Sequence, residues 1–390
     1  MKHPTTSRAW LAKLVSFDTT SRNSNLELIL NLQDWFVANG LTPRLTHNTK
    51  DKKANLFATL PAFDGNTHGG LILSGHTDVV PVDGQVWNTD PFVATTINDR
   101  IYGRGTTDMK GFIATTLALL PEFKKMRLSK PLHFAFSYDE EVGCHGAVHL
   151  IEDILMQGIE PDACIVGEPT SMQLIVAHKG INLFRCRIHG NAKHSSLTSE
   201  GCNAIEYAAL LIGWIRQFAD KVREKGPKDN HFDVPFTTLS TNLIQGGNAF
   251  NTIPALCEFF FEFRNLPTTH RASITDAINE YIQNDLLPKM RSEYPEAKIE
   301  LDALAAVPSF EAAEDAHITQ ILRKLTGHTQ ISKVAYATEA GLFQQAGIPT
   351  ILCGPGSIEQ AHGANEYISL EQLEKCESFL RDLMTQYYCL

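Results

Sequence analysis

The first 180 residues alternate short apolar runs with longer stretches in which apolar residues recur at helical spacing. Three short apolar runs bounded by Gly, Pro or Asp are typical of buried strands: 71–73, 132–137 and 163–166. Asn25 as a possible N-cap and Gly40 as a stop would delimit the first of three predicted helices, 26–38, 109–126 and 144–156. This alternation favours an α/β layer with a largely parallel sheet.

The order of elements changes in the middle of the chain. The pattern there predicts, in turn, a strand at 183–188, a helix at 203–218, strands at 237–245 and 255–264, a helix at 271–287 and a strand at 298–301. This β-α-β-β-α-β order is the ferredoxin-like arrangement. We therefore predict a discontinuous α/β domain of residues 1–180 and 305–390, interrupted by a smaller ferredoxin-like α+β domain of residues 181–304.

Composition narrows the class of protein without identifying a function. Hydrophobic residues make up 43% of the 390 residues and charged residues 20%, as in an ordinary globular protein. The net charge of −10 predicts no general attraction to nucleic acid or to an anionic membrane. No apolar run approaches the roughly 18 residues of a membrane span, the N-terminus lacks a signal-peptide core, and the eight cysteines form no C-x-x-C pair. We therefore expect a cytoplasmic protein with reduced thiols.

Two predicted element boundaries carry charged residues that could do chemistry. His76 and Asp78 follow the first predicted strand and would face the same side of an extended segment, where the carboxylate could fix the tautomer of a ligand histidine. A hydrogen-bonded histidine at a polar strand end explains this pair equally well. Asp108 follows a Gly-x-Gly pair, but its carboxylate would repel a pyrophosphate, so a dinucleotide loop is not expected. Taken alone, Asp108 is more simply a helix N-cap.

Three further clusters follow along the chain. An acidic run, residues 139–141, comes after the second predicted strand. In an extended backbone Glu140 and Glu141 would point to opposite faces and could take separate roles, although such a run on its own is usually a solvated loop. Glu168 follows the third predicted strand, and His362 lies near the end of the chain.

The joint pattern is more informative than any single cluster. Several of the clusters follow strand candidates of one α/β region, where the ends of parallel strands collect functional loops. Together the clusters supply two histidines and several carboxylates, a set of N and O ligands suited to zinc and similar divalent metals. No G-x-S-x-G segment offers a competing serine nucleophile. The pattern therefore favours a dinuclear metal hydrolase over unrelated structural residues.

The same segments resemble the signatures of the M20 family of metallopeptidases and deacylases. Five motifs occur in the family's order and at family-like separations: SGHTDVVP (74–81), YGRGTTDMKG (102–111), SYDEEVG (137–143), VGEPT (166–170) and AHG (361–363). The resemblance covers nearly the whole chain, and ATEAGLF (337–343) is similar to the branch of bacterial deacetylases that act on N2-acetyl-L-ornithine. It implies a zinc-peptidase-like catalytic domain, an inserted lid or dimerisation domain, and a homodimer.

The resemblance also implies a role for each charged residue of these motifs. Two divalent ions are expected, most simply Zn²⁺, with Co²⁺ as an alternative. The implied ligands are His76 and Glu168 for one ion, Glu141 and His362 for the other, and Asp108 as a bridge between them. Asp78 would orient His76, and Glu140 would be the general base. The peptide bond between Asp108 and Met109 is expected to be cis.

The inserted segment has candidates of its own through the resemblance. His194 would reach the active site of a neighbouring subunit and stabilise the oxyanion of the tetrahedral intermediate. Arg264 would clamp the substrate carboxylate with its guanidinium group, assisted by Asn251. Otherwise His194 is a hydrogen-bonded surface histidine and Arg264 a member of an ordinary ion pair on a sheet. Glu339 is a candidate to bind the ammonium of an ornithine side chain.

The implied reaction is hydrolysis of N2-acetyl-L-ornithine to L-ornithine and acetate, in arginine biosynthesis, by a hydroxide held at the metals with Glu140 as general base. The predicted metal ligands support the reaction class, whereas the substrate, a small N-acyl amino acid, rests on the resemblance alone. The alternatives are other enzymes of the family, such as succinyl-diaminopimelate desuccinylase, an aminoacylase or a dipeptidase. A non-catalytic metal- or ligand-binding protein is disfavoured by the complete set of ligands.

Overall fold

The computed structural model describes residues 3–328 and 330–390, and the chain divides into two compact units. The first unit comprises Met1–Val176, Glu311–Ser332 and Thr338–Leu390, and the second comprises Ala177–Phe310 and Lys333–Ala337. The second unit is therefore an insertion slightly wider than the predicted 181–304, and it includes a short segment that the sequence did not indicate. Within the described residues, no helix combines the length and the apolar character that crossing a membrane requires.

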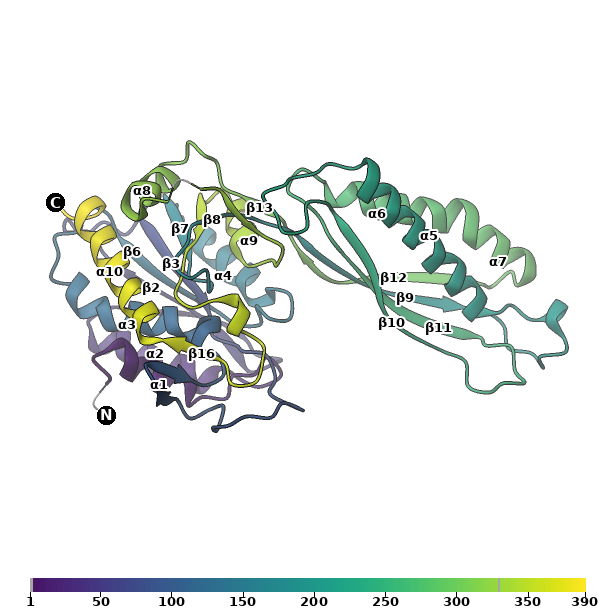
Figure 1. Ribbon diagram of the computed structural model, residues 1–390, viewed down its shortest axis with the longest axis horizontal. Coiled ribbons are helices and arrows are strands. Elements are labelled where there is room, and N and C mark those ends of the chain that lie inside the picture. Colours follow the sequence, from purple (N-terminus) through teal and green to yellow (C-terminus); the bar gives the residue numbers. More distant parts are fainter. Residues whose placement is uncertain (1–2, 329) are drawn as a thin grey trace. The chain divides into compact units, whose positions relative to one another are not determined.

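A mixed sheet forms the centre of the first unit (Figure 1). Its strands are β1 (Arg44–Asn48), β2 (Lys53–Leu60), β3 (Leu71–His76), β6 (Leu132–Ser137), β7 (Ala163–Val166), β8 (Ile175–His178), β13 (Phe310–Glu311), β14 (Ser332–Val334) and β15 (Thr350–Leu352). They are ordered β1-β2-β6-β3-β7-β15-β8-β13, with β14 paired to β8. The four central strands β6, β3, β7 and β15 run parallel. This confirms the predicted α/β class and the mainly parallel character of the central sheet.

Helices and a small second sheet complete the first unit. The helices are α1 (Ser7–Val15), α2 (Leu26–Ala38), α3 (Gly111–Phe123), α4 (His145–Met156), α8 (His317–Thr326), α9 (Ala340–Gln345) and α10 (Leu370–Tyr387), with a π-helical turn η1 (Thr106–Lys110) and a 3-10 turn η4 (Ile358–Gln360). The small sheet has the order β16 (Tyr367–Ser369), β5 (Arg100–Tyr102) and β4 (Thr95–Ile97).

Two local predictions are only partly correct. The predicted helix 109–126 begins as regular α-helix only at α3, because Asp108 and Met109 in the preceding turn have non-helical backbone angles. Asn25 is the N-cap residue of α2, as predicted, but its side chain makes no capping bond. The side chain instead bonds both main-chain groups of Ala54 and the hydroxyl of Thr77.

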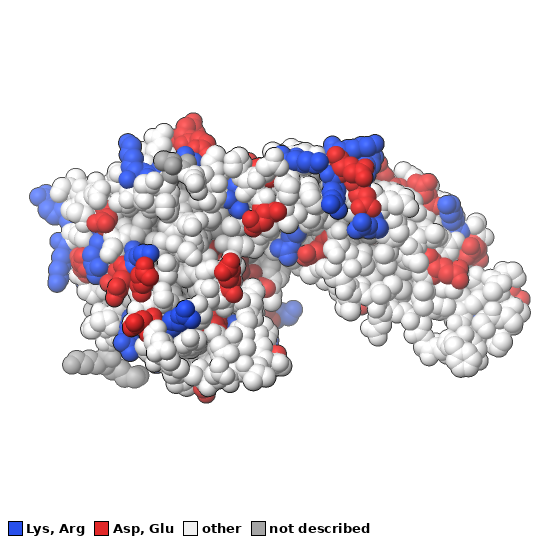
Figure 2. All heavy atoms as spheres, viewed as in Figure 1, with Lys and Arg blue, Asp and Glu red and all other residues white. Residues whose placement is uncertain are grey.

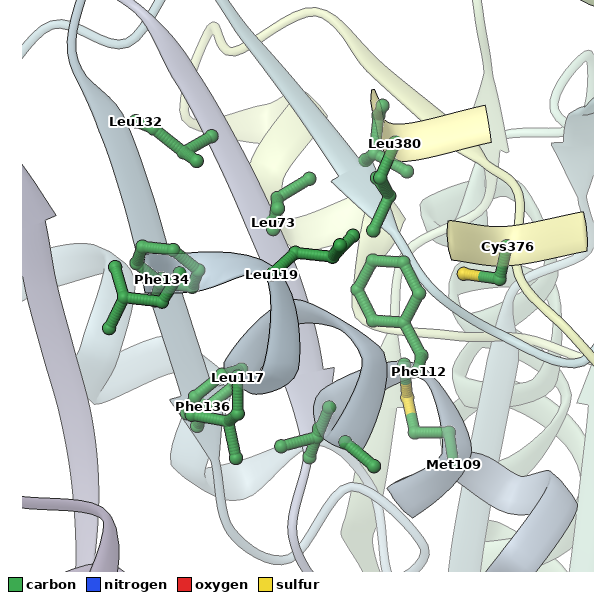
Figure 3. Packing of buried hydrophobic residues seen from close by; sticks show 14 of the residues in the cluster. Leu73, Met109, Phe112, Leu117, Leu119, Leu132, Phe134, Phe136, Cys376 and Leu380 are labelled. Carbon is green, nitrogen blue, oxygen red and sulfur yellow. The ribbon is translucent and has the colours of Figure 1, made fainter. Parts of the chain in front are cut away.

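The core of the first unit fixes the strand ends by packing α3 between the sheet and α10. Figure 3 shows Phe112 of α3 near Leu380 of α10, with Leu73 of β3 and Phe134 of β6 farther along the same cluster, and all four side chains are fully buried. Removing a large buried side chain of this kind costs about 3–5 kcal/mol because a cavity remains. The residues that follow β3 and β6 therefore project from a rigid base.

The second unit has helices packed on an antiparallel sheet. Its elements are β9 (Ile181–His189), η2 (Thr198–Glu200), α5 (Ala204–Lys225), β10 (Thr238–Gly246), β11 (Leu256–Arg264), α6 (Arg271–Tyr281), η3 (Ile282–Leu286), α7 (Leu287–Glu293) and β12 (Lys298–Val307). The strands are ordered β10-β11-β9-β12 and all pair antiparallel. This β-α-β-β-α-β order with strands 2-3-1-4 is the predicted ferredoxin-like arrangement. The predicted strand 298–301 extends to Val307.

The two faces of this second sheet differ because side chains alternate along each strand. Phe184 and Ile188 of β9 and Phe259 and Phe261 of β11 lie in a buried cluster with the helices. The opposite face carries ion pairs, such as the guanidinium of Arg185 with the carboxylate of Asp302 at 3.0 Å. Figure 2 shows acidic and basic side chains side by side over parts of the visible face.

Candidate metal centre

The parallel strands bring distant charged residues to one edge of the first unit's sheet. His76 is the last residue of β3, Glu140 and Glu141 follow β6, and Glu168 follows β7. Because β6, β3 and β7 are adjacent and parallel, their carboxyl ends lie side by side, where loops of α/β sheets form sites. The clusters that the sequence separates by dozens of residues therefore meet in space.

The first candidate ligand group consists of His76, Asp108 and Glu168, whose ligand atoms all lie within 4.8 Å of one another. Nε2 of His76 is 3.1 Å from Oδ1 of Asp108 and 3.9 Å from Oε1 of Glu168. All three residues are buried. The imidazole therefore presents one nitrogen to two carboxylates in a site with little access to water.

The second candidate group shares Asp108 with the first and adds Glu141 and His362. Nε2 of His362 lies 3.2 Å from Oδ2 of Asp108 and 3.2 Å from Oε2 of Glu141. The two oxygens of Asp108 thus face different histidines. The peptide bond between Asp108 and Met109 is cis, as the family resemblance implies. One carboxylate between two ligand groups is the arrangement expected of a bridge between two ions.

The residues of both groups fit divalent cations. Imidazole nitrogens with carboxylate oxygens are the ligands that zinc and related metals take. Oε1 of Glu141 and Oε1 of Glu168 are buried, and the described residues place no hydrogen-bond donor on either. A buried carboxylate oxygen without a donor is costly, and a cation in either group would offset that cost.

The electrostatics of the metal-free groups show the same need for positive charge. Burial, followed by the charge of Asp108, raises the pKa of Glu141 to about 7 and also raises the pKa of Glu168. Hydrogen bonds with Asp108 and Glu141 raise the pKa of His362 to about 10. Burial opposes the charge of Asp108, yet its bonds with His362 and His76 hold its pKa well below the usual range. Without metal the site therefore holds protons in place of cations.

Asp78 contacts His76 differently from the sequence expectation. The Nδ1 atom of His76 lies 2.9 Å from the main-chain carbonyl oxygen of Asp78, and the nearer carboxylate oxygen is 3.7 Å away. The carbonyl therefore fixes the imidazole. The carboxylate instead accepts hydrogen bonds from Ser21 Oγ and from the main-chain N–H groups of Glu140 and Glu141. It holds the acidic run beside the end of β3.

Glu140 belongs to neither ligand group. Its Oε1 accepts a hydrogen bond from the thiol of Cys144 at 3.4 Å. Burial raises its pKa well above the usual value, and the charges of Glu141 and Asp108 act in the same direction. A carboxyl group beside the ligands, but not among them, is free to exchange a proton.

The structure corrects the expectation that Glu339 binds a substrate ammonium group. Its side chain is fully buried, and its two carboxylate oxygens accept hydrogen bonds from Ser74 Oγ at 2.6 Å and Ser137 Oγ at 2.7 Å. Both serines lie on neighbouring strands, β3 and β6. Glu339 therefore joins two strand ends inside the protein instead of facing a ligand.

The remaining candidates belong to the second unit. His194 is exposed, and its Nδ1 lies 2.8 Å from Ser196 Oγ. Its segment lies against that of Asn251, because Ser195 N donates to the main-chain oxygen of Asn251 at 2.9 Å. The guanidinium of Arg264 pairs with Glu262, with the closest approach 3.2 Å. The structure thus brings His194 and Asn251 together and places Arg264 in an ion pair on the sheet.

Sequence reasoning missed two residues that hold the ligand segments. Arg104 and Glu366 form a buried ion pair at 2.7 Å that contacts the turns carrying Asp108 and His362. Both lie within or just after motifs already singled out, but their spacing of 262 residues hides the pair from any local pattern. The sequence signal for this pair is the position of Arg104 between two glycines of the motif YGRGTTDMKG.

Comparisons with known proteins find relatives along nearly the whole chain. Residues 72–386 match the family described as Peptidase family M20/M25/M40. An acetylornithine deacetylase of Pasteurella multocida (strain Pm70) is 39% identical over 377 residues, which cover 95% of this chain and 94% of that protein.

Solved structures share the fold at low identity. An M20 family metallo-carboxypeptidase, Sso-CP2, from Sulfolobus solfataricus has a TM-score of 0.74 at 18% identity, covering 99% of both chains. The YXEP protein of Bacillus subtilis, described as a dinuclear metal binding peptidase of the M20 family, has a TM-score of 0.65 at 14% identity, covering 97% of both chains.

Proposed function

The chain belongs to peptidase family M20/M25/M40, and on this premise we propose that it hydrolyses N2-acetyl-L-ornithine to L-ornithine and acetate, a reaction of arginine biosynthesis. The observation that supports this choice of substrate is the 39% identity to an acetylornithine deacetylase across 95% of the chain. The reaction class is supported by the two ligand groups that share Asp108.

Metal binding and proton transfer are assigned to different residues of the site. His76 and Glu168 would hold one divalent ion, zinc or cobalt, and Glu141 and His362 the other, with Asp108 between them. Such ions polarise an amide carbonyl and make water a better nucleophile. Glu140 takes a proton from the attacking water and delivers it to the departing amine. Its position beside the two ligand groups, but outside both of them, leaves its carboxylate free for these two transfers.

The second unit would recognise the rest of the substrate and act as a lid or dimerisation domain. We assign the substrate carboxylate to Arg264 and Asn251, and the developing oxyanion to His194 from a neighbouring subunit. For Arg264 this role requires exchange of its partner Glu262 for the substrate carboxylate. A guanidinium group forms two parallel hydrogen bonds with either carboxylate, so the exchange keeps its geometry.

A homodimer would form through the edge strand β10. This strand ends the four-stranded sheet of the second unit, and it exposes Leu243 and Ile244. The segment 238–257 contains no charged residue, and Figure 2 shows mainly uncharged surface in the region of β10 and β11. Natural edge strands usually carry charges that prevent pairing. An uncharged and partly apolar edge supports pairing with a second copy.

An amine-release assay with added Zn²⁺ or Co²⁺ tests the proposal by comparing N2-acetyl-L-ornithine with N-succinyl-diaminopimelate. We expect the acetyl substrate to be preferred. Glu140→Gln serves as the control for contaminating activity, because it should retain metal yet lose about 2–4 orders of magnitude in kcat. Preference for the succinyl substrate would overturn the substrate and keep the reaction class. Full turnover by Glu140→Gln would overturn the role of Glu140.

A further inference from the structure

A buried ion pair outside the ligand groups connects the two turns that complete them. Arg104 and Glu366 are each 1% exposed, and Nη1 of Arg104 lies 2.7 Å from Oε2 of Glu366. Burying two charges carries a large desolvation cost, which further hydrogen bonds to the same two groups help to offset. The further partners of this pair are therefore informative.

Glu366 binds the turn that carries Asp108. Its Oε1 accepts the main-chain N–H groups of Thr107 at 2.8 Å and Asp108 at 3.1 Å, and its Oε2 accepts the N–H of Gly105 at 2.9 Å. Gly105 has a φ of 81°, a left-handed conformation that glycine adopts without steric cost. Three amides of one turn thus converge on one carboxylate, which fixes the backbone of the bridging residue.

Arg104 binds the turn that carries His362. Its Nη1 donates to the carbonyl oxygen of Gly363 at 3.2 Å, and its Nη2 lies 3.4 Å from that of His362. Nη2 also donates to Oε1 of Gln85 at 2.7 Å, while Nε2 of Gln85 donates to the carbonyl of His362 at 2.8 Å. A planar guanidinium group reaches all these acceptors at once.

The two turns need such a brace because neither belongs to the parallel sheet. His76, Glu141 and Glu168 are carried by or directly follow sheet strands, whereas Asp108 lies in a π-helical turn and His362 in a loop after η4. Near both turns, β16 pairs with β5 and sets Tyr367 opposite Tyr102. That register places Glu366 beside the turn that follows β5.

We propose that Arg104 and Glu366 are positioning residues that hold Asp108 and His362 at the spacing a divalent ion requires, and so set the affinity of the ligand group formed by Asp108, Glu141 and His362. The pair acts through main-chain groups of the ligand residues and touches no ligand atom. The inference rests on the proposed function, because it requires that these residues bind metal ions.

Zinc titration of the metal-free protein by calorimetry tests the proposal. Glu366→Gln turns an N–H₂ group toward amide donors, and Arg104→Lys keeps the charge but loses the planar fork. Each should weaken at least one zinc affinity about 10–100-fold, as loss of partners behind metal ligands typically does. The zinc concentration for half-maximal activation should rise by the same factor, while kcat recovers at saturating zinc.

Two controls separate positioning from general loss of stability. Arg44→Lys changes a guanidinium group that lies outside the ligand turns and pairs with Asp153 at a distance of 2.7 Å. Leu383→Ala opens a cavity at a buried residue of α10. Both should bind zinc as the wild type does. If the pair variants do not fold, Gln85→Ala removes one contact of the same brace from a half-buried position and should weaken zinc affinity in the same direction.

The outcomes separate this inference from the proposed function. Unchanged zinc affinities in Arg104→Lys and Glu366→Gln, or in Gln85→Ala, would overturn the positioning role and leave the proposed reaction standing. An equal loss in Leu383→Ala would also overturn it, because stability alone would then explain the effect. A wild-type protein that binds zinc but leaves N2-acetyl-L-ornithine intact would overturn the proposed substrate and leave the role of the pair intact.

Discussion

The carboxylate of Asp78 accepts the main-chain N–H of Glu140 at 3.1 Å. Its other oxygen accepts the N–H of Glu141 at 3.3 Å and the hydroxyl of Ser21 at 2.7 Å. The carbonyl of the same residue fixes His76. Asp78 therefore couples one histidine of the candidate centre to the loop that carries the proposed general base and a ligand of the other group.

Asp78→Ala should lower kcat far more than it raises KM. Its loss frees two amides of the acidic run, and a displacement of about 1 Å at a catalytic group can cost roughly 100-fold in rate. Asp78→Asn keeps one acceptor oxygen and should fall between the alanine variant and the wild type. Steady-state kinetics at saturating zinc measure both parameters.

Ser21→Ala is the matched control for Asp78, because it removes one hydroxyl donor and leaves both amide contacts in place. It should change kcat little. A wild-type kcat in Asp78→Ala would show that the acidic run keeps its position without these hydrogen bonds.

Removing the metal should reverse the pH dependence of stability between about pH 5 and 8. In the metal-free protein the pKa of Glu141 is raised to about 7, so the folded state holds a proton that the unfolded state has lost, and stability falls as pH rises through that window. The raised pKa of His362, about 10, also makes stability fall as pH rises. Asp108, whose pKa is lowered, loses its contribution only at lower pH.

With zinc bound, the free energy of unfolding should instead rise with pH over this range, because the ion competes with protons for the same ligands. The metal-free protein should lose on the order of 1–3 kcal/mol between pH 5 and 8. Urea unfolding at several pH values, with chelator and with excess zinc, gives both slopes. Equal slopes under the two conditions would mean that these groups do not bind the ion.

The grouping of the candidate ligands could be predicted because most of them follow a short apolar strand or a Gly-rich turn, and parallel strand ends meet in space. Their individual roles came from the family resemblance. The mistaken role of Glu339 has a physical cause as well. Its partners Ser74 and Ser137 lie 265 and 202 residues away, so no local pattern could show that its carboxylate is already engaged. The Arg104–Glu366 pair escaped prediction for the same reason.

A charge on the edge strand of the second unit should prevent dimer formation. Ile244→Glu places a carboxylate on β10, where the side chain is 51% exposed, so folding of the monomer should be unaffected. Light scattering coupled to gel filtration should find a dimer for the wild type and a monomer for the variant. Ser240→Glu, also on β10 and exposed, shows whether the effect depends on the apolar position. A wild-type monomer would contradict pairing through this edge.

Glu339→Gln should lower stability without changing the choice of substrate. Its carboxylate joins Ser74 and Ser137 across two neighbouring strands, and an amide would keep one acceptor but turn N–H₂ toward a hydroxyl group. Weakening a buried hydrogen bond of this kind costs about 1–3 kcal/mol. The ratio of kcat/KM between N2-acetyl-L-ornithine and a neutral N-acetyl amino acid should equal that of the wild type, and Ser137→Ala should show the same stability loss. A selective rise of KM for the ornithine substrate would instead place Glu339 in the binding pocket.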